Sequence, residues 1–125
     1  MLVLDTHVLV WWASDPALLG ARARRAIGGE ETLGVPAIVF WETSLLVRRR
    51  RLHLGVPVRE RADVVLAIPR IEALPLTPEI ALAARVVRHA DPADRFVVAT
   101  ALRYGAPLIT KDRPIRTLRF IKTIW

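Results

Sequence analysis

Short apolar runs alternate along this chain with segments in which apolar residues recur at helical spacing. The first run, Leu2-Val3-Leu4, ends at Asp5 and has the length of a buried strand. The next segment predicts a helix, because four of its apolar residues fall at helical spacing: Val8, Leu9, Trp11 and Trp12. The chain therefore opens with a strand that leads into a helix.

Two more helices are predicted in the first half of the chain. Asp15-Pro16 has the form of a helix start, with Asp as the cap and Pro at the first position, and Gly28-Gly29 stops this helix. Its apolar residues are Leu18, Leu19, Ala23 and Ile27. Pro36 begins the next helix, which continues through Phe40, Leu45 and Val47 and runs into the arginines 48–51.

Three helices are predicted in the second half. The first spans 58–67. Thr77-Pro78-Glu79 begins the second, which ends near His89, because a Thr cap, a first-position Pro and a first-turn acid all favour a helix start. Asp91-Pro92 begins the third, which continues through Tyr104 to a glycine stop at Gly105.

The remaining apolar segments have the length and flanking residues of short buried strands. They lie at 32–35, 71–74, 107–110 and 120–124. Strands that alternate with amphipathic helices predict an α/β fold, with a mostly parallel sheet of four or five strands covered by helices on both faces.

The composition fits one compact domain, residues 1–125. The hydrophobic fraction of 53% is ample for a buried core, and no apolar run approaches the roughly 20 residues that span a bilayer. No basic segment or cleavage site precedes the opening run, so we expect no signal peptide. The absence of cysteine excludes disulfides, thiolate zinc sites and cysteine nucleophiles, and the cytoplasm is the default location.

The chain is strongly basic. Its formal charge of +7 comes from 17 arginines and 2 lysines against 12 acidic residues. This balance favours a polyanionic partner such as nucleic acid, or the acidic tail of another protein. The alternative is that the arginine content reflects genome composition or a hot environment.

Four carboxylates lie where parallel strands would bring them together. Asp5 directly follows the first predicted strand, and Asp112 follows the fourth by one residue. Glu42 lies about two turns into the helix after the second strand, and Asp94 lies in the first turn of the helix before the fourth. Ligands of open parallel sheets bind beyond the carboxyl ends of the strands, so these side chains can converge at one edge.

Such a cluster would need protons or a cation. Two carboxylates about 5 Å apart repel each other by roughly 3 kcal/mol at an effective dielectric constant near 20. The group would therefore hold protons at raised pKa or bind a hard cation. Oxygen ligands favour Mg²⁺ or Mn²⁺ over zinc, and such ions support phosphodiester hydrolysis by activating water.

Helix capping is the alternative role for three of the four acids. Asp5 and Asp112 could cap the helices that follow them, and Asp94 could stabilise the first turn of its helix. Glu42 is harder to explain in this way, because its neighbours are apolar: Phe40, Trp41, Leu45 and Leu46. An unpartnered carboxylate in such surroundings costs several kcal/mol.

The segments that carry these acids resemble those of the PIN domain, and specifically of the VapC-type toxins of bacterial and archaeal toxin–antitoxin pairs. They are Leu4-Asp5-Thr6-His7, Trp41-Glu42-Thr43, Asp91-Pro92-Ala93-Asp94-Arg95 with 96–101 after it, and Leu108-Ile109-Thr110-Lys111-Asp112. Each string is weak alone, but all four occur in order, at family-like spacing, over nearly the whole chain.

The resemblance implies a three-layer α/β/α sandwich and a metal-dependent endoribonuclease. It also implies a homodimer and a cognate antitoxin whose tail covers the site. Carried over by position, the acidic quartet and its hydroxyl neighbours are Asp5, Glu42, Asp94, Asp112, Thr6 and Thr110.

Within this quartet we expect Asp5 and Asp94 to be the principal ligands of Mg²⁺, for which Mn²⁺ could substitute. Glu42 and Asp112 would complete the shell directly or through water, and Glu42 could orient the attacking water. No histidine needs to act as a base, because the metal lowers the pKa of its own water. We expect His7 to be a packed or surface residue, and His53 and His89 carry no spacing signal.

Asp91 and Arg95 belong to a DPxDR variant shared by many such toxins. Asp91 lies one turn before Asp94 and could supplement the site, but we favour a role as helix cap because Pro92 follows it. Arg95 could pair with a carboxylate or with the scissile phosphate, and we favour the carboxylate.

The arginines 48–51 could bind phosphates or simply stabilise a helix end. Trp11, Trp12 and Trp41 are expected in the core or at an interface. Since consecutive helix residues cannot share one face, either Trp11 or Trp12 should lie near the surface.

Two other functions compete with the ribonuclease. A haloacid-dehalogenase-like phosphatase would need a second acid two residues after Asp5, where His7 stands, and the chain is short for that family. A non-catalytic PIN-like platform for RNA or protein would be expected to have lost some of the four acids. The RNA target, the antitoxin and the number of metal ions are not encoded in any motif of the sequence.

Overall fold

Five parallel strands form the middle layer of the molecule. The structure, a computed structural model, describes residues 1–125. The strands are β1 (Leu2–Leu4), β2 (Leu33–Pro36), β3 (Ile71–Leu74), β4 (Leu108–Ile109) and β5 (Thr123–Ile124). They lie in the order β3-β2-β1-β4-β5, and Val3 of the central β1 strand lies opposite Gly34 and Leu108. The predicted parallel sheet is confirmed, with the first apolar run of the sequence at its centre.

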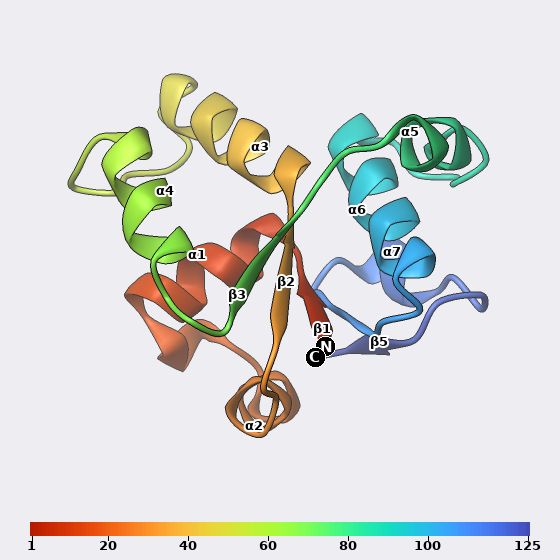
Figure 1. Ribbon diagram of the computed structural model, residues 1–125, viewed down its shortest axis with the longest axis horizontal. Coiled ribbons are helices and arrows are strands. Elements are labelled where there is room, and N and C mark those ends of the chain that lie inside the picture. Colours follow the sequence, from red (N-terminus) through yellow and green to blue (C-terminus); the bar gives the residue numbers. More distant parts are fainter.

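Helices cover both faces of this sheet. They are α1 (Thr6–Ser14), α2 (Ala21–Gly28), α3 (Ala37–Arg48), α4 (Val58–Leu66), α5 (Pro78–Ala84), α6 (Pro92–Arg103) and α7 (Arg113–Arg116), with a short 3₁₀ helix η1 (Pro16–Leu18). Figure 1 shows α1, α3 and α4 on one side of the strands and α5, α6 and α7 on the other, as expected for an α/β/α sandwich. None of the helices has the length and apolar character needed to span a bilayer.

The helix predicted from Asp15 is divided in two. Asp15 caps only η1, where its Oδ1 accepts a hydrogen bond from the amide of Ala17 at 3.2 Å. Leu19 then has extended backbone, with φ −78° and ψ 144°, and α2 begins after Gly20. The extended Leu19 reaches the core, where it is 3% exposed, while Leu18 is 53% exposed. The break therefore buries one of two adjacent leucines that a continuous helix would have placed on different faces.

The two later helix starts are confirmed, and one helix end is wrong. The hydroxyl of Thr77 caps α5 by accepting a hydrogen bond from the amide of Ile80 at 3.3 Å. This helix ends at Ala84, short of the predicted end near His89, and turns lead from there to α6. Gly105 follows α6 with a φ of +59°, a left-handed conformation that suits glycine and stops the helix as predicted.

The core places the ends of β1 and β4 side by side. All three residues of β1 and both residues of β4 are buried. Gly34 of β2 allows close packing, because a Cβ atom there would come within 2.7 Å of Leu74 Cδ1. This apolar packing fixes the carboxyl edge of the sheet, from which the residues after β1 and β4 project.

Candidate active site

A cleft of about 590 Å³ opens at the carboxyl ends of β1 and β4. We call it the acidic cleft, because five carboxylates line it: Asp5, Glu42, Asp91, Asp94 and Asp112. They come from the residue before α1, from the middle of α3, from the start of α6 and from the residue before α7. The four acids expected to converge therefore lie around one cleft, because neighbouring parallel strands end at the same edge.

Asp5 is the most deeply buried of these acids, with 5% of its surface exposed. Its Oδ1 accepts a hydrogen bond from the amide of Val8 at 3.1 Å, which caps α1. Its Oδ2 accepts a hydrogen bond from the hydroxyl of Thr110. Burial raises the pKa of Asp5, although these hydrogen bonds act in the opposite direction. Asp5 thus has the capping role considered as an alternative, and it also faces the acidic cleft.

Glu42 enters the acidic cleft from α3 and is 9% exposed. The hydroxyl of Thr6 donates a hydrogen bond to Glu42 Oε2 at 2.5 Å. Burial raises the pKa of Glu42, and the nearby charges of Asp91 and Asp5 add to this effect. The partner that this buried carboxylate needs is therefore a hydroxyl group and not a lysine or arginine.

Asp94 lies in the first turn of α6, with 20% of its side chain exposed. Burial is the main reason that its pKa is raised to about 7, and the charges of Glu42, Asp5 and Asp91 add to it. The neighbouring His89 acts in the opposite direction. Near neutral pH, Asp94 is therefore divided between its protonated and ionised forms.

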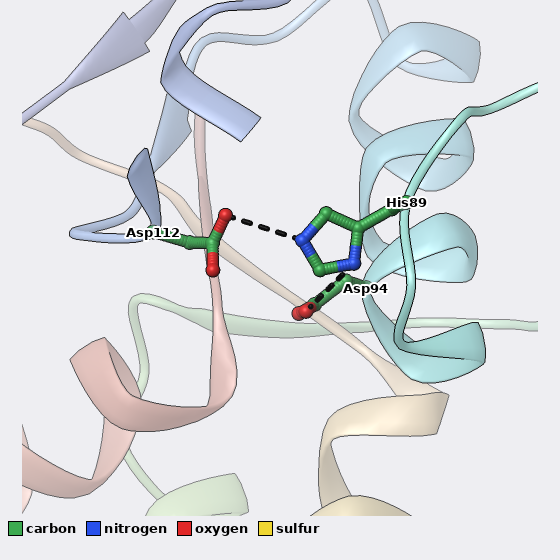
Figure 2. A group of neighbouring side chains, drawn as sticks. All are labelled: His89, Asp94 and Asp112. Carbon is green, nitrogen blue, oxygen red and sulfur yellow. Dashed lines mark hydrogen bonds and ion pairs between the residues drawn. The ribbon is translucent and has the colours of Figure 1, made fainter. Parts of the chain in front are cut away.

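His89 lies between Asp94 and Asp112, a position that the sequence did not indicate (Figure 2). Its Nδ1 is 3.2 Å from Asp94 Oδ2, its Nε2 is 3.2 Å from Asp112 Oδ1, and its side chain is 7% exposed. The backbone amide of Asp91 also donates to Nδ1, at 3.1 Å. The only signal in the sequence is that His89 precedes by two residues the cap of the helix that carries Asp94.

The side chain of Asp112 is 32% exposed, more than those of Asp94 and His89. Its Oδ1 accepts a hydrogen bond from the amide of Ile115 at 2.8 Å and so caps α7. Its own amide donates to the hydroxyl of Thr110 at 3.0 Å. Thr110 therefore connects Asp112 to Asp5, since the same hydroxyl donates to the Asp5 carboxylate.

The DPxDR segment differs from expectation at its arginine. Asp91 caps α6, because its Oδ1 accepts a hydrogen bond from the amide of Ala93 at 2.9 Å, and it also lines the acidic cleft. Arg95 forms no salt bridge with a carboxylate. Its Nε donates instead to the backbone carbonyl of His89 at 2.6 Å, so the expected carboxylate pair is wrong. Arg95 holds the turn that positions His89.

Basic residues form part of the wall of the same cleft. They are Arg51, Lys111, Arg113 and Arg116. Of the arginines 48–51, only Arg51 lines the cleft, because α3 ends at Arg48 and the chain turns through a left-handed Arg50 with φ of 56°. The cleft therefore combines buried negative charge with positive charge at its wall.

Aromatic residues lie beside the acidic cleft in a pattern that the sequence did not predict. The ring centroids of His7 and Trp11 are 5.6 Å apart, and those of Trp11 and Trp125 are 5.8 Å apart. The Nζ of Lys111 lies 4.4 Å from the centroid of the Trp11 ring. Trp11 and Trp12 both pack against the core and both remain partly exposed.

Two sets of atoms in the acidic cleft are suited to a metal ion. One nitrogen of His89 and one carboxylate oxygen each from Asp94 and Asp112 lie within 4.8 Å of one another. Asp5 and Glu42 each have a hydroxyl donor on one oxygen, and no lysine or arginine pairs with either. Carboxylate oxygens of this kind favour Mg²⁺ or Mn²⁺. Of these two ions, Mn²⁺ is the transition-metal ion and is favoured by an imidazole nitrogen.

Known proteins share sequence and fold with this chain. The PIN-domain family profile matches residues 2–121. Ribonuclease VapC22 of Mycobacterium tuberculosis is 34% identical over 128 residues, which cover 98% of this chain and 97% of that protein.

Two solved structures share the fold at lower identity. A toxin–antitoxin complex from Klebsiella pneumoniae aligns with a TM-score of 0.66 and 16% identity, covering 97% of this chain and 95% of that one. VapC20 of M. tuberculosis, described as a sarcin–ricin loop cleaving toxin, aligns with a TM-score of 0.62 and 18% identity, covering 98% and 99%. The chain therefore belongs to the PIN-domain family, among its VapC-type members.

Proposed function

We propose that this protein is a divalent-metal-dependent endoribonuclease that hydrolyses RNA phosphodiester bonds. The observation that carries the proposal is the acidic cleft, where Asp5, Glu42 and Asp94 lie together without a lysine or arginine partner. Such a group is stabilised by protons or by a hard cation, and burial raises the pKa of all three. Similarity to ribonuclease VapC22 supports RNA as the substrate.

The donor atoms fit Mg²⁺ with Mn²⁺ as a substitute. We assign Asp5 and Asp94 as the principal ligands, and Glu42 and Asp112 as the residues that complete the shell directly or through water. His89 adds a nitrogen donor beside Asp94 and Asp112. Nitrogen ligands favour Mn²⁺ over Mg²⁺, so His89 would shift the preference of the site towards Mn²⁺.

A bound divalent cation would supply an activated water molecule and neutralise charge that develops on the phosphate. The neighbouring residues of the chain would position the carboxylates that bind the cation. Thr110 holds one oxygen of Asp5 and Thr6 holds one oxygen of Glu42, which fixes the direction of each carboxylate. Glu42, which lines the acidic cleft, would orient the attacking water.

The remaining charged residues of the DPxDR segment, Asp91 and Arg95, hold the backbone that carries the site residues. Asp91 caps the helix that carries Asp94. Arg95 holds the turn that carries His89. We therefore assign both to positioning, with Asp91 also contributing negative charge to the acidic cleft.

We further propose that the protein is the toxin of a toxin–antitoxin pair. The similar structures include a toxin–antitoxin complex, and the chain matches VapC22 over 97% of its length. A cognate antitoxin, a homodimeric assembly, a single domain over residues 1–125 and a cytoplasmic location belong to this proposal.

The activity can be tested with a labelled single-stranded RNA and purified protein. The RNA would be incubated with Mg²⁺, with Mn²⁺ and with EDTA, using the wild type and the Asp94→Asn variant. We expect cleavage with either ion, none in EDTA, and a loss of at least about a hundredfold in the variant, because a ligand is removed.

Asp63→Asn is a matched control, since Asp63 pairs with Arg59 on the surface of α4, outside the acidic cleft. It should cleave like the wild type. Cleavage that persists in EDTA would contradict the metal-dependent mechanism. RNA binding without cleavage under any condition would favour a non-catalytic platform, and phosphate release from a small phosphomonoester would favour a phosphatase.

A further inference from the structure

A second hollow, of about 470 Å³, adjoins the acidic cleft, and no acidic side chain lines it. We call it the basic groove. Its lining residues are Arg22, Arg113, Arg116, Thr117, Thr123 and Trp125. Arg113, Arg116 and Trp125 also line the acidic cleft, so the two hollows share a wall.

The arginines of the basic groove have no partner within the chain. Arg22, Arg113 and Arg116 are exposed, and none of them forms a salt bridge. The arginine side chains that do donate hydrogen bonds lie elsewhere, on Arg59, Arg61, Arg70 and Arg95. The groove therefore presents unpaired guanidinium groups, whose planar set of donors suits phosphate oxygens.

Trp125 stands where the two hollows meet, and its place is fixed from two sides. Its ring centroid is 5.8 Å from that of Trp11, with the ring planes at 54°. Gly20 allows the approach from the other side, because a Cβ atom there would come within 2.9 Å of the Trp125 backbone carbon and 3.3 Å of its indole Nε1. Trp125 is only partly buried and lines both hollows, so its indole ring offers an exposed, packed aromatic surface to a ligand there.

We propose that the basic groove binds the sugar–phosphate backbone of RNA on one side of the scissile bond, and that Trp125 stacks on a base at the junction. This inference rests on the proposed function. An RNA strand whose scissile phosphate lies among carboxylates needs positive charge along its neighbouring phosphates. The three arginines of the groove offer this charge, and no acidic side chain lies among them. An acidic peptide would also be attracted by the arginines, but the aromatic surface at the junction favours a nucleobase.

Fluorescence anisotropy tests the proposal with a fluorescein-labelled oligouridylate of about 20 nucleotides, which covers the site size of typical single-strand binders. The Asp94→Asn background prevents cleavage. Arg22→Gln and Arg116→Gln should each weaken binding by about threefold to tenfold, nearly independently of RNA sequence. Each should also lower the slope of log affinity against log salt by about 0.7, the value for one single-strand phosphate contact.

The chain offers a matched control for each arginine. Arg25 lies three residues after Arg22 on α2, and Arg119 lies three residues after Arg116; both are exposed and neither lines the groove. Arg25→Gln and Arg119→Gln should leave affinity and slope unchanged. Trp125→Leu should weaken binding without changing the slope, because stacking involves no ion release, and Trp125→Phe should restore much of the loss.

Groove variants with unchanged affinity and slope, in a protein that cleaves RNA as wild type, would overturn the inference and leave the proposed function intact. The same holds if these variants bind RNA normally but lose only binding to a polyglutamate peptide, which would assign the groove to a protein partner. A wild-type protein that neither binds nor cleaves RNA would overturn the proposed function and this inference together.

Discussion

The acidic cleft and the basic groove lie next to each other and differ in the sign and the burial of their charged side chains. The acidic cleft buries carboxylates whose oxygens are held by hydroxyl groups, as at Asp5 and Glu42. The basic groove leaves its arginines exposed and unpaired. Salt bridges between the two sets would have neutralised both, yet the chain contains none between them.

This separation indicates that each region is complementary to a ligand rather than to the other region. Buried like charges destabilise the metal-free protein and are relieved by protons or by a cation. Exposed guanidinium groups affect stability little, and they act on a polyanion through salt-dependent attraction. Changes in the acidic cleft should therefore alter activity, metal affinity and stability, whereas changes to the exposed arginines of the basic groove should weaken RNA binding and leave stability nearly unchanged.

The largest effect is expected from Asp5→Asn. The side-chain oxygen of asparagine keeps the cap of α1, but its NH2 group cannot accept the hydrogen bond from Thr110, and the negative charge is lost. RNA cleavage should therefore fall at least about a hundredfold while the fold is retained. Asp15→Asn is the control, because Asp15 also caps a helix but is exposed and lies outside the acidic cleft. Equal cleavage rates of the two variants would remove Asp5 from the metal site.

Thr110→Val should have the next largest effect. The substitution keeps the shape of the side chain but removes the donor to Asp5 and the acceptor for the amide of Asp112, so cleavage should fall about tenfold to a hundredfold. Thr100→Val is the control, since the buried Thr100 hydroxyl donates only to the Phe96 carbonyl within α6. If both variants lost activity to the same degree, the loss would reflect packing and not the carboxylates.

Because of Asp94, the stability of the metal-free protein should depend on pH. Its pKa is about 7 in the folded chain against an ordinary value of 3.8, so the folded state binds more protons between these values. The metal-free protein should therefore lose stability as pH rises from about 4 to about 7. In EDTA at pH 8, Asp94→Asn should raise Tm by roughly 2–6 °C, measured by calorimetry. A variant that melts below the wild type under these conditions would contradict the claim that the buried, ionised Asp94 side chain destabilises the metal-free protein.

A smaller effect is expected at His89. Because imidazole favours transition ions, His89→Gln should lower the affinity for Mn²⁺ by about tenfold and that for Mg²⁺ by much less. Isothermal titration calorimetry of both ions gives the ratio directly, and His53→Gln is the control because His53 lies outside the acidic cleft. An unchanged ratio would exclude His89 as a ligand.

Much of the fold could be predicted because local signals and the final packing agree. The run Leu2-Val3-Leu4 is apolar in sequence and is buried at the centre of the sheet. The caps at Thr77 and Asp91 act within three residues of their own position, so sequence alone indicates them. The division between η1 and α2 was missed because burial of Leu19 overrides the helix signal of Asp15-Pro16.

The candidate site was predictable only where strand ends determine it. Asp5 and Asp112 follow strands directly, so the parallel order of the sheet brings them to one edge. His89 could not be found in this way, because its position depends on the turn between α5 and α6 and on the hydrogen bond from Arg95. The basic groove joins Arg22 to residues near the end of the chain, and no local pattern connects them.

The central claim is that the carboxylates of the acidic cleft form one divalent-cation site. The most direct test is titration of the metal-free protein with Mn²⁺ at pH 8, with free ion measured by electron paramagnetic resonance. Asp5→Asn and Asp94→Asn should each weaken binding by at least about tenfold, and Asp15→Asn should bind like the wild type. Equal Mn²⁺ affinity in all four proteins would contradict the claim.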